Sequence, residues 1–328
     1  MASDDPRQQD RSCPICGSHG FRPYKLGLEQ CDACGLVISP AIWHPQANAQ
    51  LEEEWFGEGY RSDTSHWVAL FEAWSNRNTL SRLALANGPG NRLLEIGVGS
   101  GSFLNAARER GYAVMGCDLS EAICARVERA YDITMHRDSL ATLQGEERFD
   151  AVVINHVLEH VHRPIDFLQD VRRLLVSGGV AHIAVPNIAC WEAALSGWTS
   201  YEPYHLTYFS PRTLVRTVAA SGLAIDHVAT HDSFSGWFLA SLRTALGVNR
   251  SNGAVTRSAT SRAGRSGVRR SGLLEHAYRL AMVCVGSGLW PLRLLQGRLG
   301  YGDEVICIAR KPRDAEKERA SAAGRNPA

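Results

Sequence analysis

The stretch LLEIGVGSGSF, residues 93–103, sets the interpretation of the whole chain. Apolar residues around a single acid indicate a buried strand, and three alternate glycines then lead into a helix. Glycines at a strand end let the backbone approach a ligand closely, and a helix start offers unpaired N–H groups and the positive end of a dipole. The stretch therefore predicts a nucleotide-binding turn.

The spacing of the glycines separates two classes of cofactor. A dinucleotide fingerprint needs G-x-G-x-x-G, and counting from Gly97 and Gly99 puts Ser102 where the third glycine belongs. The observed order of Glu95, Gly97, Gly99 and Gly101 resembles the first motif of the class I S-adenosylmethionine-dependent methyltransferases. The resemblance implies that these four residues hold the methionine part of the cofactor.

A second short apolar strand, residues 113–118, ends in Asp118. An acid at this place can accept hydrogen bonds from both ribose hydroxyls, or it can be the N-cap of the expected helix 119–130. The glycine loop before it favours the ribose. By resemblance, Asp118 and its neighbour Leu119 belong to the cofactor site.

The next two strands end in polar residues as well. The third strand, residues 133–136, leads to Asp138 and Ser139, where the family has an acid that contacts adenine; a solvated turn is the alternative. The fourth strand, residues 149–154, leads to Asn155, which we also expect at the cofactor.

The order of elements after Asn155 is specific. Leu158-Glu159-His160 and Pro164 precede an amphipathic helix, residues 165–176, which is followed by two glycines and a fifth strand, residues 180–185. This order resembles the ubiquinone-biosynthesis O-methyltransferases and the small-molecule methyltransferases around them, over about residues 80–230. The resemblance implies an α/β fold with a Rossmann-like seven-stranded methyltransferase sheet whose seventh strand is antiparallel.

In the quinone branch of that family, an acid, a second acid three residues later and a following His bind a divalent metal. Glu159 and His160 match the last two positions, but His156 replaces the first acid. Two imidazoles and one carboxylate suit a transition metal better than magnesium. We expect instead that His160 packs at the strand end.

An aromatic segment follows the fifth strand, and residues 203–210 resemble the Pro-x-His-Leu-x-x-Phe-Ser element of bacterial relatives. Aromatic walls suit a sulfonium cofactor, and transfer to oxygen requires a base near neutral pH. His205 is the first candidate base and His160 the second; alternatively His205 anchors the loop through backbone hydrogen bonds. The expected acceptor is an oxygen of a sugar, phenol or lipid-linked glycan, with C-methylation of a deoxysugar-type substrate as the alternative.

Four of the nine cysteines form two Cys-x-x-Cys-Gly turns: Cys13 with Cys16, and Cys31 with Cys34. The pattern predicts a closed structural zinc site rather than disulfides, because the module is too small to bury a core of its own. It resembles the ribbons that precede deoxysugar C-methyltransferases. Few cations lie between the cysteine pairs, so no nucleic-acid partner is expected.

Helical patterns flank the catalytic core. A helix that begins at His66 carries Trp67, Leu70, Phe71 and Trp74 on one face, which we expect to pack over the core, with Tyr60 before it in a lid. Residues 273–295 form an apolar cap that could also contact a membrane. The expected boundaries are a zinc ribbon (1–40), a helical lid or linker (41–90), the core (91–230), a helical insertion (231–303) with a disordered arginine-rich segment (249–271), the last strand of the core (304–311) and a disordered tail (312–328).

Composition excludes other classes of protein. The 328 residues are 45% hydrophobic and 21% charged, with a net charge of +1, which provides no general attraction to nucleic acid. The absence of a signal segment predicts a cytoplasmic protein. A nicotinamide oxidoreductase and a non-catalytic zinc-ribbon scaffold are the competing functions; Ser102 argues against the first and the filled cofactor positions against the second.

Overall fold

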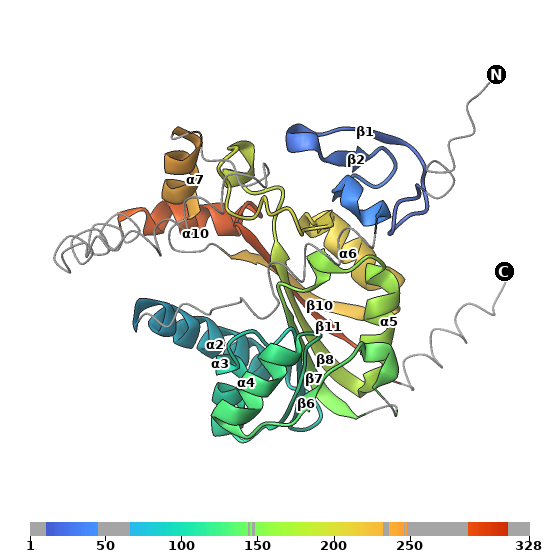
Figure 1. The fold of residues 1–328 in the computed structure, drawn as a ribbon, viewed down its shortest axis with the longest axis vertical. Coiled ribbons are helices and arrows are strands. Elements are labelled where there is room, and N and C mark those ends of the chain that lie inside the picture. The colour runs from blue at the N-terminus through green and yellow to red at the C-terminus, as the bar shows by residue number, and fades with distance from the viewer. Residues whose placement is uncertain are drawn as a thin grey trace, which may run out of the picture.

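The computed structural model describes residues 11–44, 66–143, 145, 148–231, 236–245, 247 and 288–313. A central sheet lies between two layers of helices, and a small N-terminal sheet lies beside one end of it (Figure 1). Tyr60, residues 249–271, most of residues 273–295 and the tail after residue 313 lie outside the described residues, so the expectations for them stay predictions.

The central sheet has seven strands in the order β10-β11-β8-β7-β4-β5-β6. β11 runs antiparallel to both of its neighbours, and the pairs between β8 and β6 are parallel. The predicted seven-stranded methyltransferase sheet with an antiparallel seventh strand is therefore confirmed. The strands are β4 (Arg92–Ile96), β5 (Ala113–Cys117), β6 (Met135–His136), β7 (Phe149–Asn155), β8 (Leu175–Pro186), β10 (Ala224–His231) and β11 (Glu304–Arg310).

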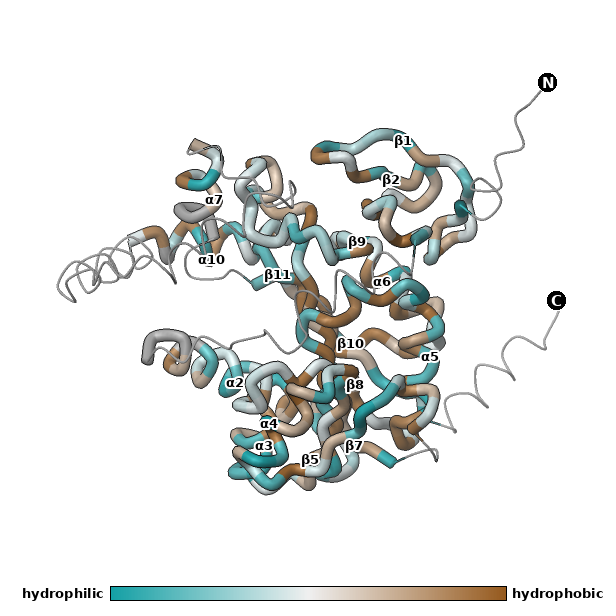
Figure 2. The backbone as a smooth tube through the Cα atoms, viewed as in Figure 1, coloured by the Kyte–Doolittle hydropathy of each residue, from teal (hydrophilic) through white to brown (hydrophobic). Residues whose placement is uncertain are grey.

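Side chains that alternate along the strands supply two hydrophobic layers. In β7, Val153 packs in the layer that includes Leu104, whereas Val152 and Ile154 pack in the layer that includes Leu168. Figure 2 shows the apolar positions gathered in the central strands. The helices on one face are α2 (His66–Ala86), α3 (Ser102–Glu109) and α4 (Glu121–Tyr131); those on the other are α5 (Pro164–Leu174) and α6 (Pro211–Ala220) (Figure 1).

The expected packing of Leu70 and Trp74 of α2 is wrong, because Leu70 is 50% exposed and Trp74 is 38% exposed. Leu80 and Leu83 in the second half are buried instead. These two leucines, which pack against the sheet, lie about three turns after Leu70. Trp74 stacks on His231 of β10 with 5.4 Å between ring centroids.

The N-terminal sheet includes one strand from the segment between β8 and α6. Its order is β1-β2-β3-β9, all pairs being antiparallel. The first three strands are β1 (Phe21–Pro23), β2 (Glu29–Cys31) and β3 (Val37–Ile38), and the fourth is β9 (Thr207–Tyr208). No sequence pattern predicted this pairing of β3 with β9.

Two described helices lie between β10 and β11, namely α7 (Gly236–Ala245) and α10 (Trp290–Arg298). Leu292, Leu294 and Leu295 of α10 are exposed, so contact of this region with a membrane stays a prediction. Among the described residues, no helix combines the length and the hydropathy needed to cross a bilayer.

Asp150 joins the first residues of two central strands. Its carboxylate accepts hydrogen bonds from the backbone N–H and the guanidinium of Arg92, at 2.9 to 3.1 Å, and the guanidinium bond lowers the pKa of Asp150. We expect Asp150→Asn to reduce the free energy of unfolding by about 1 to 2 kcal/mol at pH 7. Because the folded-state pKa is lowered, this stabilisation is lost as the pH falls below about 4. Urea unfolding at pH 7 and at pH 3 tests this; an equal difference at both values would contradict it.

Candidate cofactor and acceptor site

A cavity of about 680 Å³ opens at the carboxyl ends of β4, β5, β6 and β7. This is the edge at which open α/β sheets bind their ligands. Predicted cofactor residues on its wall are Gly97, Gly99, Asp118, Leu119, Asp138 and Ser139, and the candidate base His160 lines it as well. Glu95, Gly101, Asn155 and His205 do not line it.

Three N–H groups of the glycine loop already have hydrogen-bond partners within the chain. The N–H of Gly97 donates to the Cys117 carbonyl at 2.8 Å, and that of Val98 donates to Asp118 at 3.0 Å. The N–H of Gly101 donates to the Val98 carbonyl at 3.1 Å. A pyrophosphate would therefore find these donors already used within the chain.

The three glycines of the loop differ in what a larger side chain would contact. All three have positive φ angles, between 55° and 80°. A Cβ on Gly97 would lie 2.3 Å from a methyl group of Val157, and a Cβ on Gly101 would lie 2.9 Å from the Tyr131 ring. At Gly99 a Cβ would meet no protein atom, because the loop borders the cavity there.

Two residues of α2 hold the loop, and sequence reasoning missed both. Asn76 donates a hydrogen bond to Ser102 at 3.1 Å, and Glu72 accepts one from Ser100 at 3.2 Å. Glu72 and Asn76 are four residues apart on one helix face, a spacing that could have indicated a shared contact.

Asp118 is not a helix cap. Ser120 is the N-cap of α4, with its side chain accepting from the N–H of Ile123 at 3.4 Å. The Asp118 carboxylate instead accepts from the N–H groups of Val98 and Ser120, so that it ties the glycine loop to the end of β5. Burial raises the pKa of Asp118, and these bonds oppose that rise.

Glu95 is buried, and Asn155 is half-buried, on the two neighbouring strands that end at the cavity. Glu95 is the fourth residue of β4, and burial together with the Asp118 charge raises its pKa well above the ordinary value. Glu95 Oε2 and Asn155 Oδ1 are buried with no hydrogen-bond partner. Because buried acceptors are costly unless satisfied, these two atoms fit a ligand that brings N–H donors and positive charge.

An acid and two histidines meet at the other end of the cavity. One ligand atom each from Glu159, His160 and His205 lies within 4.8 Å of the others. Glu159 is 1% exposed. Burial would raise its pKa, but the ion pair with His156, at 3.5 Å, and the nearby imidazoles lower it to about 2, so the carboxylate is ionised.

The two histidines of this cluster differ in access. His205 is 7% exposed, its Nδ1 lies 2.9 Å from the Ser200 carbonyl, and burial lowers its pKa to about 3. His160 lines the cavity, and its Nδ1 lies 3.3 Å from the Tyr204 carbonyl. The His205 ring meets His160 edge-on at 4.9 Å, so it stands behind His160.

His156 lies outside this cluster and pairs with a residue that the sequence did not indicate. Its Nε2 is 3.0 Å from Glu304 at the start of β11, and its Nδ1 is 3.5 Å from Glu159. Desolvation opposes protonation of the ring, whose side chain is still 55% exposed, but the two carboxylates raise the pKa of His156 well above its ordinary value. The ring therefore lies between two acids at the cavity wall, which favour its protonated form.

The four predicted zinc ligands converge. The sulfurs of Cys13, Cys16, Cys31 and Cys34 lie within 4.8 Å of one another, with pairs at 3.5 and 3.6 Å. Four Zn–S bonds of about 2.3 Å in a tetrahedron place sulfurs about 3.8 Å apart, so the set fits zinc and not disulfides. Gly17 and Gly35 have positive φ angles and close the two turns by donating to Cys13 and Cys31.

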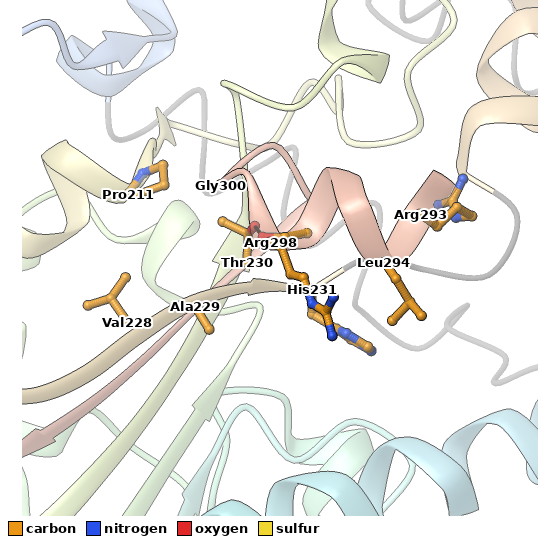
Figure 3. A pocket seen from close by; sticks show the side chains of 10 residues that line it. Pro211, Val228, Ala229, Thr230, His231, Arg293, Leu294, Arg298 and Gly300 are labelled. Carbon is orange, nitrogen blue, oxygen red and sulfur yellow. Dashed lines mark hydrogen bonds between the residues drawn. The ribbon is translucent and has the colours of Figure 1, made fainter. Parts of the chain in front are cut away.

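A smaller cavity of about 390 Å³ lies between β10 and α10. Figure 3 shows Thr230 and His231 of the strand facing Arg298 of the helix. It contains none of the residues predicted from the sequence.

Residues 68–228 match a family model described as a methyltransferase domain. The ubiquinone biosynthesis O-methyltransferase of Caulobacter vibrioides is 33% identical over 114 residues, which cover 33% of this chain and 45% of that protein. A probable S-adenosylmethionine-dependent methyltransferase of Mycolicibacterium smegmatis is 26% identical over 156 residues, covering 47% and 60%. The solved structure of a putative sarcosine dimethylglycine methyltransferase from Galdieria sulphuraria matches with a TM-score of 0.49 at 15% identity, covering 73% and 86%.

Residues 68–228 are therefore a class I S-adenosylmethionine-dependent methyltransferase domain. The chain spans about half the length of these curated relatives, 45% of one and 60% of the other.

Gly97 and Gly99 allow a matched test of the loop. Both have positive φ, but an added Cβ clashes with Val157 only at Gly97. We expect Gly97→Ala to lower the melting temperature clearly more than Gly99→Ala, which carries only backbone strain of about 1 kcal/mol. Calorimetry of both variants without cofactor measures this, and equal losses would contradict the loop geometry.

Proposed function

We propose that this chain transfers a methyl group from S-adenosylmethionine to an oxygen of a small biosynthetic acceptor, such as a sugar, a phenol or a lipid-linked glycan. The observation that carries the proposal is the pair of acids Glu95 and Asp118, both with a raised pKa. A ligand with net positive charge relieves their repulsion. A nicotinamide dinucleotide brings two phosphate charges and finds the loop N–H groups already used.

The cofactor positions divide into three groups, one for each part of the cofactor. Glu95 Oε2 and Asn155 Oδ1 would accept from the ammonium of the methionine part, and Asp118 would accept from the ribose hydroxyls. Leu119, Asp138 and Ser139 line the cavity beyond Asp118 and would surround the adenine. When bound, S-adenosylmethionine supplies an electrophilic methyl group on its sulfonium.

His160 is the base we assign for deprotonating the acceptor hydroxyl. A hydrogen bond from Nδ1–H to the Tyr204 carbonyl leaves the lone pair on Nε2. The ionised Glu159 beside it would stabilise the imidazolium that forms. His205, which the sequence placed first, is buried behind His160 and would set the orientation of its ring.

Two alternatives use the same site. Transfer to carbon, as in deoxysugar C-methylation, would need His160 to remove a proton from carbon. A transition metal would instead fit the donor set of Glu159, His160 and His205, because both histidines have Nδ1 near a backbone carbonyl, as metal-bound histidines do. This set replaces His156 with His205.

We also propose structural zinc at Cys13, Cys16, Cys31 and Cys34, supported by the sulfur spacing. A closed set of four thiolates has no open position for substrate. Reduced cysteines are typical of the cytoplasm, where we place the reaction.

Cofactor choice is tested by calorimetric titration of the purified chain. S-adenosylhomocysteine should bind, whereas NAD⁺ and NADP⁺ should not. Asp118→Ala should lower the affinity for S-adenosylhomocysteine at least about tenfold, because a charged hydrogen-bond acceptor is lost. Asp226→Ala, on the outer strand β10, is the control and should bind normally. Binding of NAD⁺ alone would overturn the proposal.

The base is tested with radiolabelled S-adenosylmethionine and a small-molecule extract of the source cells. We expect His160→Gln to reduce labelled product about 100-fold or more while its affinity for S-adenosylhomocysteine is kept, because proton removal is lost. The control is His227→Gln on the exposed side of β10, which should match the parent protein. Full activity of His160→Gln would assign the base elsewhere, and mass spectrometry of the product distinguishes O-methyl from C-methyl.

A further inference from the structure

The zinc ribbon and the aromatic segment of the catalytic domain share one sheet. Ile38 of β3 pairs with Thr207 of β9, and Val37 pairs with Tyr208. Beyond the strand, the N–H of Ser39 donates to the Leu206 carbonyl at 2.9 Å. On one side, the segment that contains His205 is therefore held by hydrogen bonds from the ribbon.

The same segment reaches the acid–histidine cluster on its other side. The N–H of Leu206 donates to the Glu159 carbonyl at 2.9 Å, and the Thr207 hydroxyl donates to the same carbonyl at 3.4 Å. A continuous series of hydrogen bonds therefore runs from Ser39 through Leu206 to the backbone of Glu159. The side chains of Glu159 and His160 belong to the cluster at the cavity.

Packing follows the same route. Leu36 and Ile38 of the ribbon lie in one buried cluster with Leu206 and Phe209, which also includes the core of the central sheet. A second cluster joins Leu28 and Val37 of the ribbon to Tyr201 and Tyr208, among others. In addition, the Lys25 ammonium donates to the Ala193 carbonyl.

The order of β3 depends on the cysteine site. β3 is two residues long and begins three residues after Cys34, whose sulfur accepts from the N–H of Leu36 at 3.5 Å. Strands this short carry little stability of their own, and small cysteine-rich modules fold when they bind metal. Zinc on the four sulfurs would hold Cys34, and with it the start of β3.

We propose that the zinc ribbon is a positioning element of the active site, which orders β9 and thereby sets Glu159, His160 and His205 at the cavity. Metal binding at Cys13, Cys16, Cys31 and Cys34 fixes β3, and β3 holds the segment on which His205 lies. The effect on catalysis rests on the proposed methyl transfer. The ordering of residues 200–210 by the ribbon is independent of that proposal.

Ser39 provides a test that leaves the cysteines intact. Its backbone angles, φ −83° and ψ 135°, suit proline, so Ser39→Pro keeps the local conformation, removes the N–H that bonds Leu206 and places the proline Cδ against the Leu206 carbonyl, which must move away. Ser39→Ala is the matched control, because it loses the same hydroxyl and keeps the N–H. Both variants should retain zinc in metal analysis.

Amide hydrogen exchange measures the ordering directly. In zinc-loaded Ser39→Pro, we expect exchange in residues 200–210 to be faster than in Ser39→Ala by about fivefold, as for the loss of one hydrogen bond. Removing zinc from the unmodified chain with a chelator should cause a larger increase in the same segment. Exchange in residues 113–117 of β5 should be unchanged in both cases.

The catalytic readout separates positioning from general damage. Ser39→Pro should lower kcat while its affinity for S-adenosylhomocysteine stays that of Ser39→Ala. Unchanged exchange in residues 200–210, both in Ser39→Pro and after chelation, would overturn the proposal. If no acceptor is ever methylated, the exchange results still decide whether zinc orders this segment.

Discussion

The rest of the site depends on two acids, Glu95 and Asp118, that are buried close together at the ends of β4 and β5. Glu95 and Asp118 repel each other there, and burial favours protonation of both. The N–H of Val98 bonds to Asp118, but those of Gly97 and Gly101 bond to the carbonyls of Cys117 and Val98 and do not offset this charge. A ligand that carries positive charge completes this arrangement better than a pyrophosphate, which is the ligand that related folds hold at this edge.

The sequence predicted the parts of the fold that are local in origin. Apolar runs that end in Glu95, Asp118 and Asn155 located the parallel strands, because buried strands produce such runs wherever they lie. Asp118 was placed correctly at a strand end, although Ser120 caps the helix that follows. The aromatic half of α2 misled, because helical periodicity identifies a face but not the neighbour it meets, and Leu70 meets solvent.

Contacts between distant segments could not be predicted in the same way. β9 has two residues, too few for any periodic pattern, and its pairing with β3 is visible only in three dimensions. Glu304 reaches His156 because β11, which follows a long insertion, lies between β10 and β8 in the sheet. The burial of His205 behind His160 likewise depends on the contact between residues 200–206 and the segment that contains Glu159 and His160.

The position of β11 also has a consequence for how the chain comes to fold. β11 lies between β8 and β10, yet both of those strands leave the ribosome well before residues 304–310 do. Until then each has an open edge, the kind of surface on which nascent chains aggregate. The strand that closes this gap is also the one that brings Glu304 to His156. A chain stalled inside the insertion therefore lacks both the strand that pairs β8 with β10 and the acid that pairs with His156.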